Sequence, residues 1–80
     1  MARRSKLQAS FGQVLRDARS KAGMTQETLA EASDLHRTYV SLLERGLKSP
    51  SLAAVEALAS ALGRLPHELV EDAESRAKIK

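Results

Sequence analysis

The chain of 80 residues contains no cysteine and only two aromatic residues, Phe11 and Tyr39. The lack of cysteine excludes disulfides and thiolate-bound metals. Two histidines, His36 and His67, are too few for a metal site without carboxylate help. A core with so few aromatic residues must be built from Leu, Val and Ala, which favours helices over strands. We therefore expect a small all-α domain stabilised by helix packing or by a partner subunit.

The sequence also lacks long apolar segments. Its longest stretch without a charged residue, Leu7–Leu15, is far too short to span a membrane. No apolar stretch follows the charged residues near the start of the chain, as one would in a signal peptide. We therefore expect a cytoplasmic protein with no membrane partner.

The net charge of +3 is distributed unevenly along the chain. Residues 1–48 contain nine Lys and Arg against five Asp and Glu, whereas residues 49–80 contain four against five. A basic first half is typical of a surface that faces phosphates, although a merely solvated surface can show the same imbalance.

Capping and turn residues predict five helices. Residues 1–9 form a basic N-terminal arm in this prediction, and residues 10–80 form the domain. Ser10 is the expected N-cap of the first helix, with Gln13 completing a capping box, and Gly23 is the expected end. The apolar positions at helical spacing are Phe11, Val14, Leu15, Ala18 and Ala22.

The second and third expected helices are short. Thr25 caps the second, the segment 33–35 forms a turn, and either Asp34 or His36 caps the third, which ends at Gly46. The apolar residues expected to face the core are Leu29, Ala30, Ala32, Val40 and Leu43.

The last two helices are separated by Gly63. Ser49 is the expected cap of the fourth, with Pro50 in its first turn, although Ser51 could serve instead. Pro66 begins the fifth. Their apolar positions are Leu52, Val55, Leu58, Ala59 and Leu62, followed by Leu69, Val70, Ala73 and Ala77.

The segment from Thr25 to Gly46 carries the strongest functional signal. It predicts two short helices joined by a tight corner, and the second helix opens with polar and basic side chains. This is the helix-turn-helix arrangement, in which one helix crosses the DNA backbone and the next enters the major groove.

The segment MTQETLAEASDLHRTYVSLLERGLKSPSLAAVEALASAL resembles the XRE type of helix-turn-helix domain, the phage-repressor and Cro type. The resemblance extends from Phe11 to Val70 and includes TQ at a helix start, a central LA, ERG and PSL. The short chain and its RTYVS segment are similar to controller proteins of restriction–modification systems. The resemblance implies a five-helix DNA-binding domain that needs no cofactor or metal.

The resemblance implies DNA contacts from the third helix. Arg37 and Thr38 are expected to touch base edges, since an arginine can bond guanine through two hydrogen bonds. Ser41 could contact a base or a phosphate, or be merely solvated. Leu42 stands where relatives often have a polar or small residue, and it could pack on a thymine methyl group or be buried.

Phosphate contacts are expected on both sides of that helix. Gln26 lies in the first turn of the second helix, where the positive end of the helix also attracts phosphate. Tyr39 could donate its hydroxyl hydrogen to the DNA backbone, or its ring could simply pack at the edge of the core. The basic candidates are Arg45 and Lys48, with Arg3, Arg4 and Lys6 in the arm.

Two further expectations concern the scaffold. In the resembled family, an arginine of the first helix pairs with a glutamate at the end of the third. Arg19 and Glu44 match those positions, and we interpret them as a structural brace. Many relatives have glycine in the interhelical turn, where Asp34 stands here, but aspartate tolerates the left-handed conformation.

A homodimer on a palindromic operator is expected, because one copy covers a single half-site. The fifth helix supplies the predicted interface, although its apolar residues could instead close the monomer core. The operator complex would block RNA polymerase or contact it. The expected interface residues are Leu65, Leu69, Val70 and Ala73.

Other classes of function have weaker support. An antitoxin would use the same fold but commonly adds a larger toxin-binding segment than residues 71–80 offer. A protein-only adaptor would not need Arg37 and Gln26. An enzyme is not expected, since His36, Glu44 and His67 share no helical spacing suited to a metal and no catalytic triad is discernible.

Overall fold

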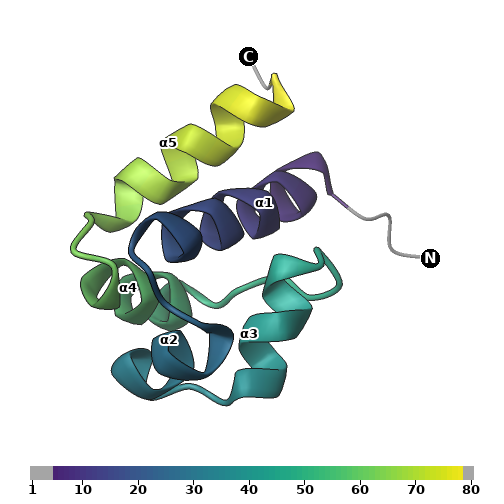
Figure 1. Ribbon diagram of the computed structural model, residues 1–80. Coiled ribbons are helices and arrows are strands. Elements are labelled where there is room, and N and C mark those ends of the chain that lie inside the picture. The colour runs from purple at the N-terminus through teal and green to yellow at the C-terminus, as the bar shows by residue number, and fades with distance from the viewer. Residues whose placement is uncertain (1–4, 79–80) are drawn as a thin grey trace.

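The computed structural model describes residues 5–78, which form five α-helices and no strand (Figure 1). In Figure 1, α1 and α5 lie side by side above α2, α3 and α4. The predicted all-α fold with five helices is confirmed. Their bounds are α1 Lys6–Lys21, α2 Gln26–Ser33, α3 Arg37–Glu44, α4 Leu52–Ala61 and α5 Pro66–Ala77.

The core is built from small aliphatic side chains, as the composition predicts. Every helix contributes at least one side chain that is essentially inaccessible to water. Within residues 5–78, Phe11 is the only aromatic residue that is buried. Burial of these apolar side chains, which contributes roughly 1.5–3 kcal/mol each to the free energy of folding, is the main source of stability. The largest of them are Leu15, Leu29, Val40, Leu43, Leu58 and Leu69.

Helix α1 begins earlier than predicted, so the proposed cap at Ser10 is wrong. Ser5 is the N-cap, and its Oγ accepts a hydrogen bond of 2.9 Å from the backbone N–H of Gln8. The extra turn places Leu7 against the core and leaves Ser10 buried inside the helix. Of the predicted basic arm, Lys6 is an exposed residue of α1, whereas Arg3 and Arg4 lie outside the described residues.

Three expected apolar positions are exposed instead, the first of them Ala22, the C-cap of α1. Ala32 is exposed, because α2 turns Leu29, Ala30 and Ser33 toward the core instead. Leu52 is 89 % exposed, because it lies on the side of α4 away from the core, which the helix contacts through Ala54, Val55, Leu58 and Ala59.

The cap of α4 is Ser51, the alternative that the sequence left open beside Ser49. Its Oγ accepts a hydrogen bond of 3.0 Å from the N–H of Ala54. Pro66 occupies the first turn of α5, as predicted.

Candidate nucleic-acid interface

The corner between α2 and α3 fixes the direction in which α3 leaves. Asp34 adopts the left-handed backbone conformation, with φ 57° and ψ 40°, so the prediction that aspartate would serve in place of glycine is confirmed. The N–H of Leu35 donates to the carbonyl of Ala30 at 2.9 Å and closes the corner. His36 is the N-cap of α3, but its side chain makes no capping hydrogen bond.

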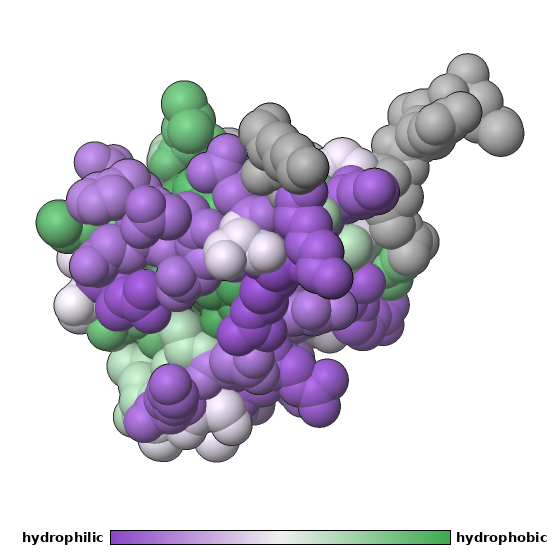
Figure 2. Space-filling model, turned by 90° about the horizontal axis from the view of Figure 1, so that it is seen from above, coloured by the Kyte–Doolittle hydropathy of each residue, from purple (hydrophilic) through white to green (hydrophobic). Residues whose placement is uncertain are grey.

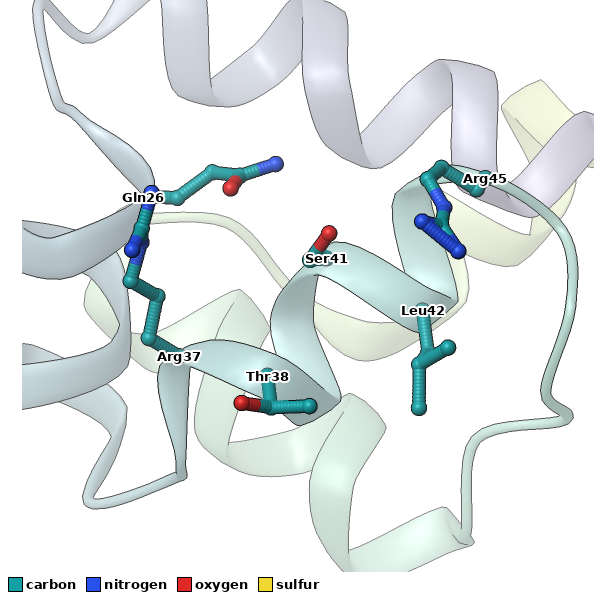
Figure 3. Close-up of a pocket in the computed structure, with 6 residues that line it drawn as sticks. All are labelled: Gln26, Arg37, Thr38, Ser41, Leu42 and Arg45. Carbon is teal, nitrogen blue, oxygen red and sulfur yellow. The ribbon is translucent and has the colours of Figure 1, made fainter.

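The outward side of α3 and the start of α2 together line a shallow hollow (Figure 3). Arg37 and Thr38 are exposed in the first turn of α3, and Ser41 and Leu42 are half-buried one turn further along. Four side chains that the sequence proposed for base contacts therefore share one surface. Leu42 is part of that surface rather than fully buried. The hollow is lined by Gln26, Arg37, Thr38, Ser41, Leu42 and Arg45.

The other proposed phosphate contacts flank this hollow. The ammonium group of Lys48, in the loop after α3, lies 5.7 Å from the centroid of the Tyr39 ring. The ring is half-buried against the core, and the hydroxyl accepts a hydrogen bond of 3.3 Å from the N–H of Ser51. Tyr39 is thus a core-edge aromatic whose hydroxyl keeps its own hydrogen for donation to another acceptor.

Arg19 and Glu44 form the predicted pair. Arg19 donates from Nε to Glu44 Oε2 at 2.6 Å and from Nη2 to Oε1 at 3.1 Å. The Glu44 side chain is only 3 % exposed, so this two-bond geometry compensates a buried charge. The hydrogen bond to Glu44, opposed by desolvation, raises the pKa of Arg19 above its ordinary value.

The pair is part of a larger network that the sequence did not reveal. Arg19 Nη1 donates to the carbonyl of Met24 at 2.9 Å, just before α2. Gln26 Nε2 donates to Glu44 Oε1 at 3.0 Å. The last turn of α3 is therefore joined to α1, to the loop before α2 and to the first turn of α2.

Two glycines let α1 approach the end of α3. A Cβ atom at Gly12 would lie 2.7 Å from the carbonyl oxygen of Glu44, so only glycine fits there without a shift of the backbone. Gly46 has φ +71°, and its carbonyl accepts a hydrogen bond of 2.9 Å from Gln8 Nε2. A glycine inside a predicted helix is the only sequence signal for this close contact.

The predicted dimer interface requires a correction. Leu69 and Ala73 are 0 % exposed, because their side of α5 packs on α1 and completes the monomer core. Leu65, which precedes α5, is 58 % exposed, and Val70 is half-buried. Figure 2, a view onto α1 and α5, shows mostly hydrophilic side chains, with hydrophobic ones toward the side where α5 begins.

A largely apolar groove runs between the start of α4 and α5. Exposed Leu52 belongs to it, so that position is a surface feature and not part of the core. The full lining is Leu52, Val55, Pro66, His67, Val70, Glu71 and Glu74.

Residues 5–78 offer neither a cluster of metal ligands nor a membrane-spanning helix. Within that range, no three His, Asp or Glu side chains gather as metal ligands. None of the helices in the described part of the chain is long and apolar enough to cross a membrane.

The corner between α2 and α3 and the polar, basic outer side of α3 define a helix-turn-helix domain. Residues 10–73 match the family model described as a helix-turn-helix domain, so the chain belongs to the helix-turn-helix family. The predicted resemblance to its XRE type is confirmed by the relatives, which place the chain among DNA-binding regulators of transcription.

The control protein C.BamHI of Bacillus amyloliquefaciens is 48 % identical over 62 residues, which cover 76 % of each chain. The restriction–modification controller protein C.AhdI of Aeromonas hydrophila is 48 % identical, with a TM-score of 0.75 over 76 % of this chain and 92 % of its own. The controller protein C.Esp1396I, solved as a tetramer with its natural 35 base-pair operator, is 30 % identical, with a TM-score of 0.82 over 92 % and 97 %.

Proposed function

We propose that the chain is a restriction–modification controller protein that binds a palindromic operator as a homodimer. The observation that carries the proposal is the exposed polar and basic side of α3, held in place by the Arg19–Glu44 pair. The 48 % identity to C.BamHI and to C.AhdI supports the controller class.

The dimensions of α3 suit the major groove. An α-helix with its side chains is about 10–12 Å in diameter, which fits the groove width of about 12 Å, and the eight residues of α3 form about two turns. Arg37 and Thr38 project from the end that enters first and are the proposed readers of base edges. Ser41 and Leu42 follow on the same surface and contact a base or a thymine methyl group.

Phosphate contacts hold α3 in register. Arg45 and Lys48 provide positive charge at the far end of α3, and Gln26 provides an amide donor at the start of α2. The hydroxyl hydrogen of Tyr39 provides another donor. The charged contacts release counterions, so affinity falls as salt increases.

A second copy accounts for the exposed apolar surface at α4 and α5. Leu52 and Leu65 are 89 % and 58 % exposed, and Leu52 lines a groove that is largely apolar. Covering this surface with another copy would form a dimer, and dimers of this class bind half-sites about 34 Å apart. The dimer would then regulate a promoter by blocking RNA polymerase or by contacting it.

Fluorescence anisotropy with duplex DNA tests the DNA-binding part of this proposal. We expect binding to duplex DNA that weakens steeply between about 50 and 200 mM salt. Absence of binding at the lower salt would contradict the proposal and favour a protein-only adaptor. Co-purification with one dedicated partner protein would favour an antitoxin.

A further inference from the structure

The side chain of Gln26 is held by the same carboxylate that holds Arg19. Glu44 Oε1 accepts from Gln26 Nε2 at 3.0 Å and from Arg19 Nη2 at 3.1 Å. Gln26 is half-buried and lines the hollow beside α3, where Figure 3 shows its side chain extending from α2 toward Ser41. One carboxylate oxygen thus connects the interior of the domain to the proposed DNA-facing surface.

We propose that Glu44 is a positioning residue for DNA binding and acts by fixing the carboxamide of Gln26. This inference rests on the proposed function. A glutamine has two amide N–H groups, and a free side chain can rotate to present either the nitrogen or the oxygen. Because Glu44 accepts one N–H, the nitrogen of Gln26 is held in place, and its second N–H is oriented for a phosphate oxygen.

The charge of the network explains why the arrangement suits DNA. An unpaired carboxylate at this depth would repel the phosphate that Gln26 is to meet. Arg19 donates two hydrogen bonds to Glu44 and thereby compensates its charge. Glu44 can therefore orient the amide without placing a net negative charge beneath the DNA backbone.

A preoriented donor binds more tightly than a mobile one, because less conformational freedom is lost when the complex forms. Gln26 is neutral and releases no counterion. Its contribution to affinity should therefore be independent of salt, in contrast to that of Lys48.

A double-mutant cycle for DNA affinity tests the inference. In the wild-type background, Gln26→Ala should weaken binding about tenfold, the usual size for a hydrogen bond to a charged group. In a background in which Arg19→Met and Glu44→Leu remove the pair together, the same change should weaken binding by less than about twofold. Equal losses in both backgrounds would overturn the inference, as would no loss in the wild type.

Two controls separate this effect from general damage. Lys48→Ala should weaken binding by the same factor in both backgrounds, because Lys48 is not part of the network. If the wild-type protein fails to bind any duplex, the proposed function itself fails. If it binds but the cycle shows no coupling, only the role of Glu44 fails.

A second measurement applies even if the paired variant does not fold. In the free wild-type protein, the side-chain amide hydrogens of Gln26 should exchange with water more slowly than those of exposed Gln13 on α1. The amide of Gln8, which donates to Gly46, supplies a bonded reference in the same spectrum. Exchange at Gln26 as fast as at Gln13 would overturn the inference.

Discussion

Arg19, in the last turn of α1, donates two hydrogen bonds to Glu44 and so joins α1 to the end of the proposed recognition helix, α3. The two residues are 25 positions apart in the sequence. The pair secures the end of α3, whereas the Asp34 corner sets its beginning. The orientation of α3 is therefore determined at both ends by groups that need not touch DNA.

Removing one member of this pair should destabilise the whole domain. Arg19→Met leaves the Glu44 carboxylate buried without its cation, and we expect a loss of about 3–5 kcal/mol in the free energy of unfolding. Urea denaturation followed by circular dichroism measures the loss. Arg16→Met, an exposed position on the same helix, should change stability by less than about 0.5 kcal/mol. Equal stability of the two variants would contradict the assigned role of Arg19.

The start of α5 should make stability sensitive to acid. The N–H of Leu65 donates to Glu68 Oε1 at 2.9 Å, and Arg64 lies 3.4 Å from the same oxygen. The backbone hydrogen bond first, and then Arg64, lower the pKa of Glu68 below its ordinary value of 4.5, with desolvation in partial opposition. A lowered folded-state pKa means that the contribution of Glu68 is present above pH 4.5 and is lost as the pH falls through the folded-state value.

The variant Glu68→Gln isolates this charge, because glutamine keeps an acceptor for the Leu65 N–H. We expect it to be less stable than the wild type at neutral pH and to lose less stability between about pH 5 and pH 3. Thermal melts at several pH values measure the difference. Parallel curves for the two proteins across that range would refute the contribution assigned to Glu68.

The exposed leucines at α4 and α5 should control assembly. Leu52→Glu or Leu65→Glu places a charge on the proposed apolar interface, and each should shift a dimer toward monomer at tens of micromolar in analytical ultracentrifugation. The domain should stay folded, since both side chains are largely exposed. Ala32→Glu on α2 adds the same charge elsewhere and should leave the mass unchanged. Dimers that persist in both leucine variants would place the interface on another surface.

Two basic residues should differ in what they contribute to DNA binding. Arg37→Ala should reduce discrimination at one base position by about 1–3 kcal/mol, because arginine can bond guanine through two hydrogen bonds. Lys48→Ala should weaken binding to all sequences alike and reduce the slope of log affinity against log salt concentration by about one. Binding titrations on the operator and on single-base variants at several salt concentrations separate these effects. The opposite pattern would reverse the two roles.

The sequence predicted most of the fold because its signals are local. The cap at Thr25, the left-handed residue at Asp34 and the glycine after α1 follow from backbone preferences that act within a few residues, whereas Ser51 caps α4 in place of Ser49, the first choice. The prediction failed where two local signals competed. Ser5 and Ser10 can both cap a helix. The helix begins after Ser5 because the additional turn packs Leu7 against the core.

The rest of the site depends on contacts between distant segments. The resemblance to known regulators identified the Arg19–Glu44 pair, but no sequence signal indicated that Gln26 shares the same carboxylate. The sequence assigned both Leu69 and Leu65 to the dimer interface, and only the packing of α5 on α1 shows that Leu69 is buried whereas Leu65 remains at the surface. Periodicity alone does not separate a core residue from an interface residue.

Selection of bound duplexes from a random pool tests the central claim most directly, since it reports both sequence recognition and assembly. We expect enrichment of a palindrome whose two half-sites are centred about 34 Å, or one helical turn, apart. Recovery of a single half-site without symmetry would contradict the dimer. Recovery of no common sequence would contradict sequence-specific recognition by α3.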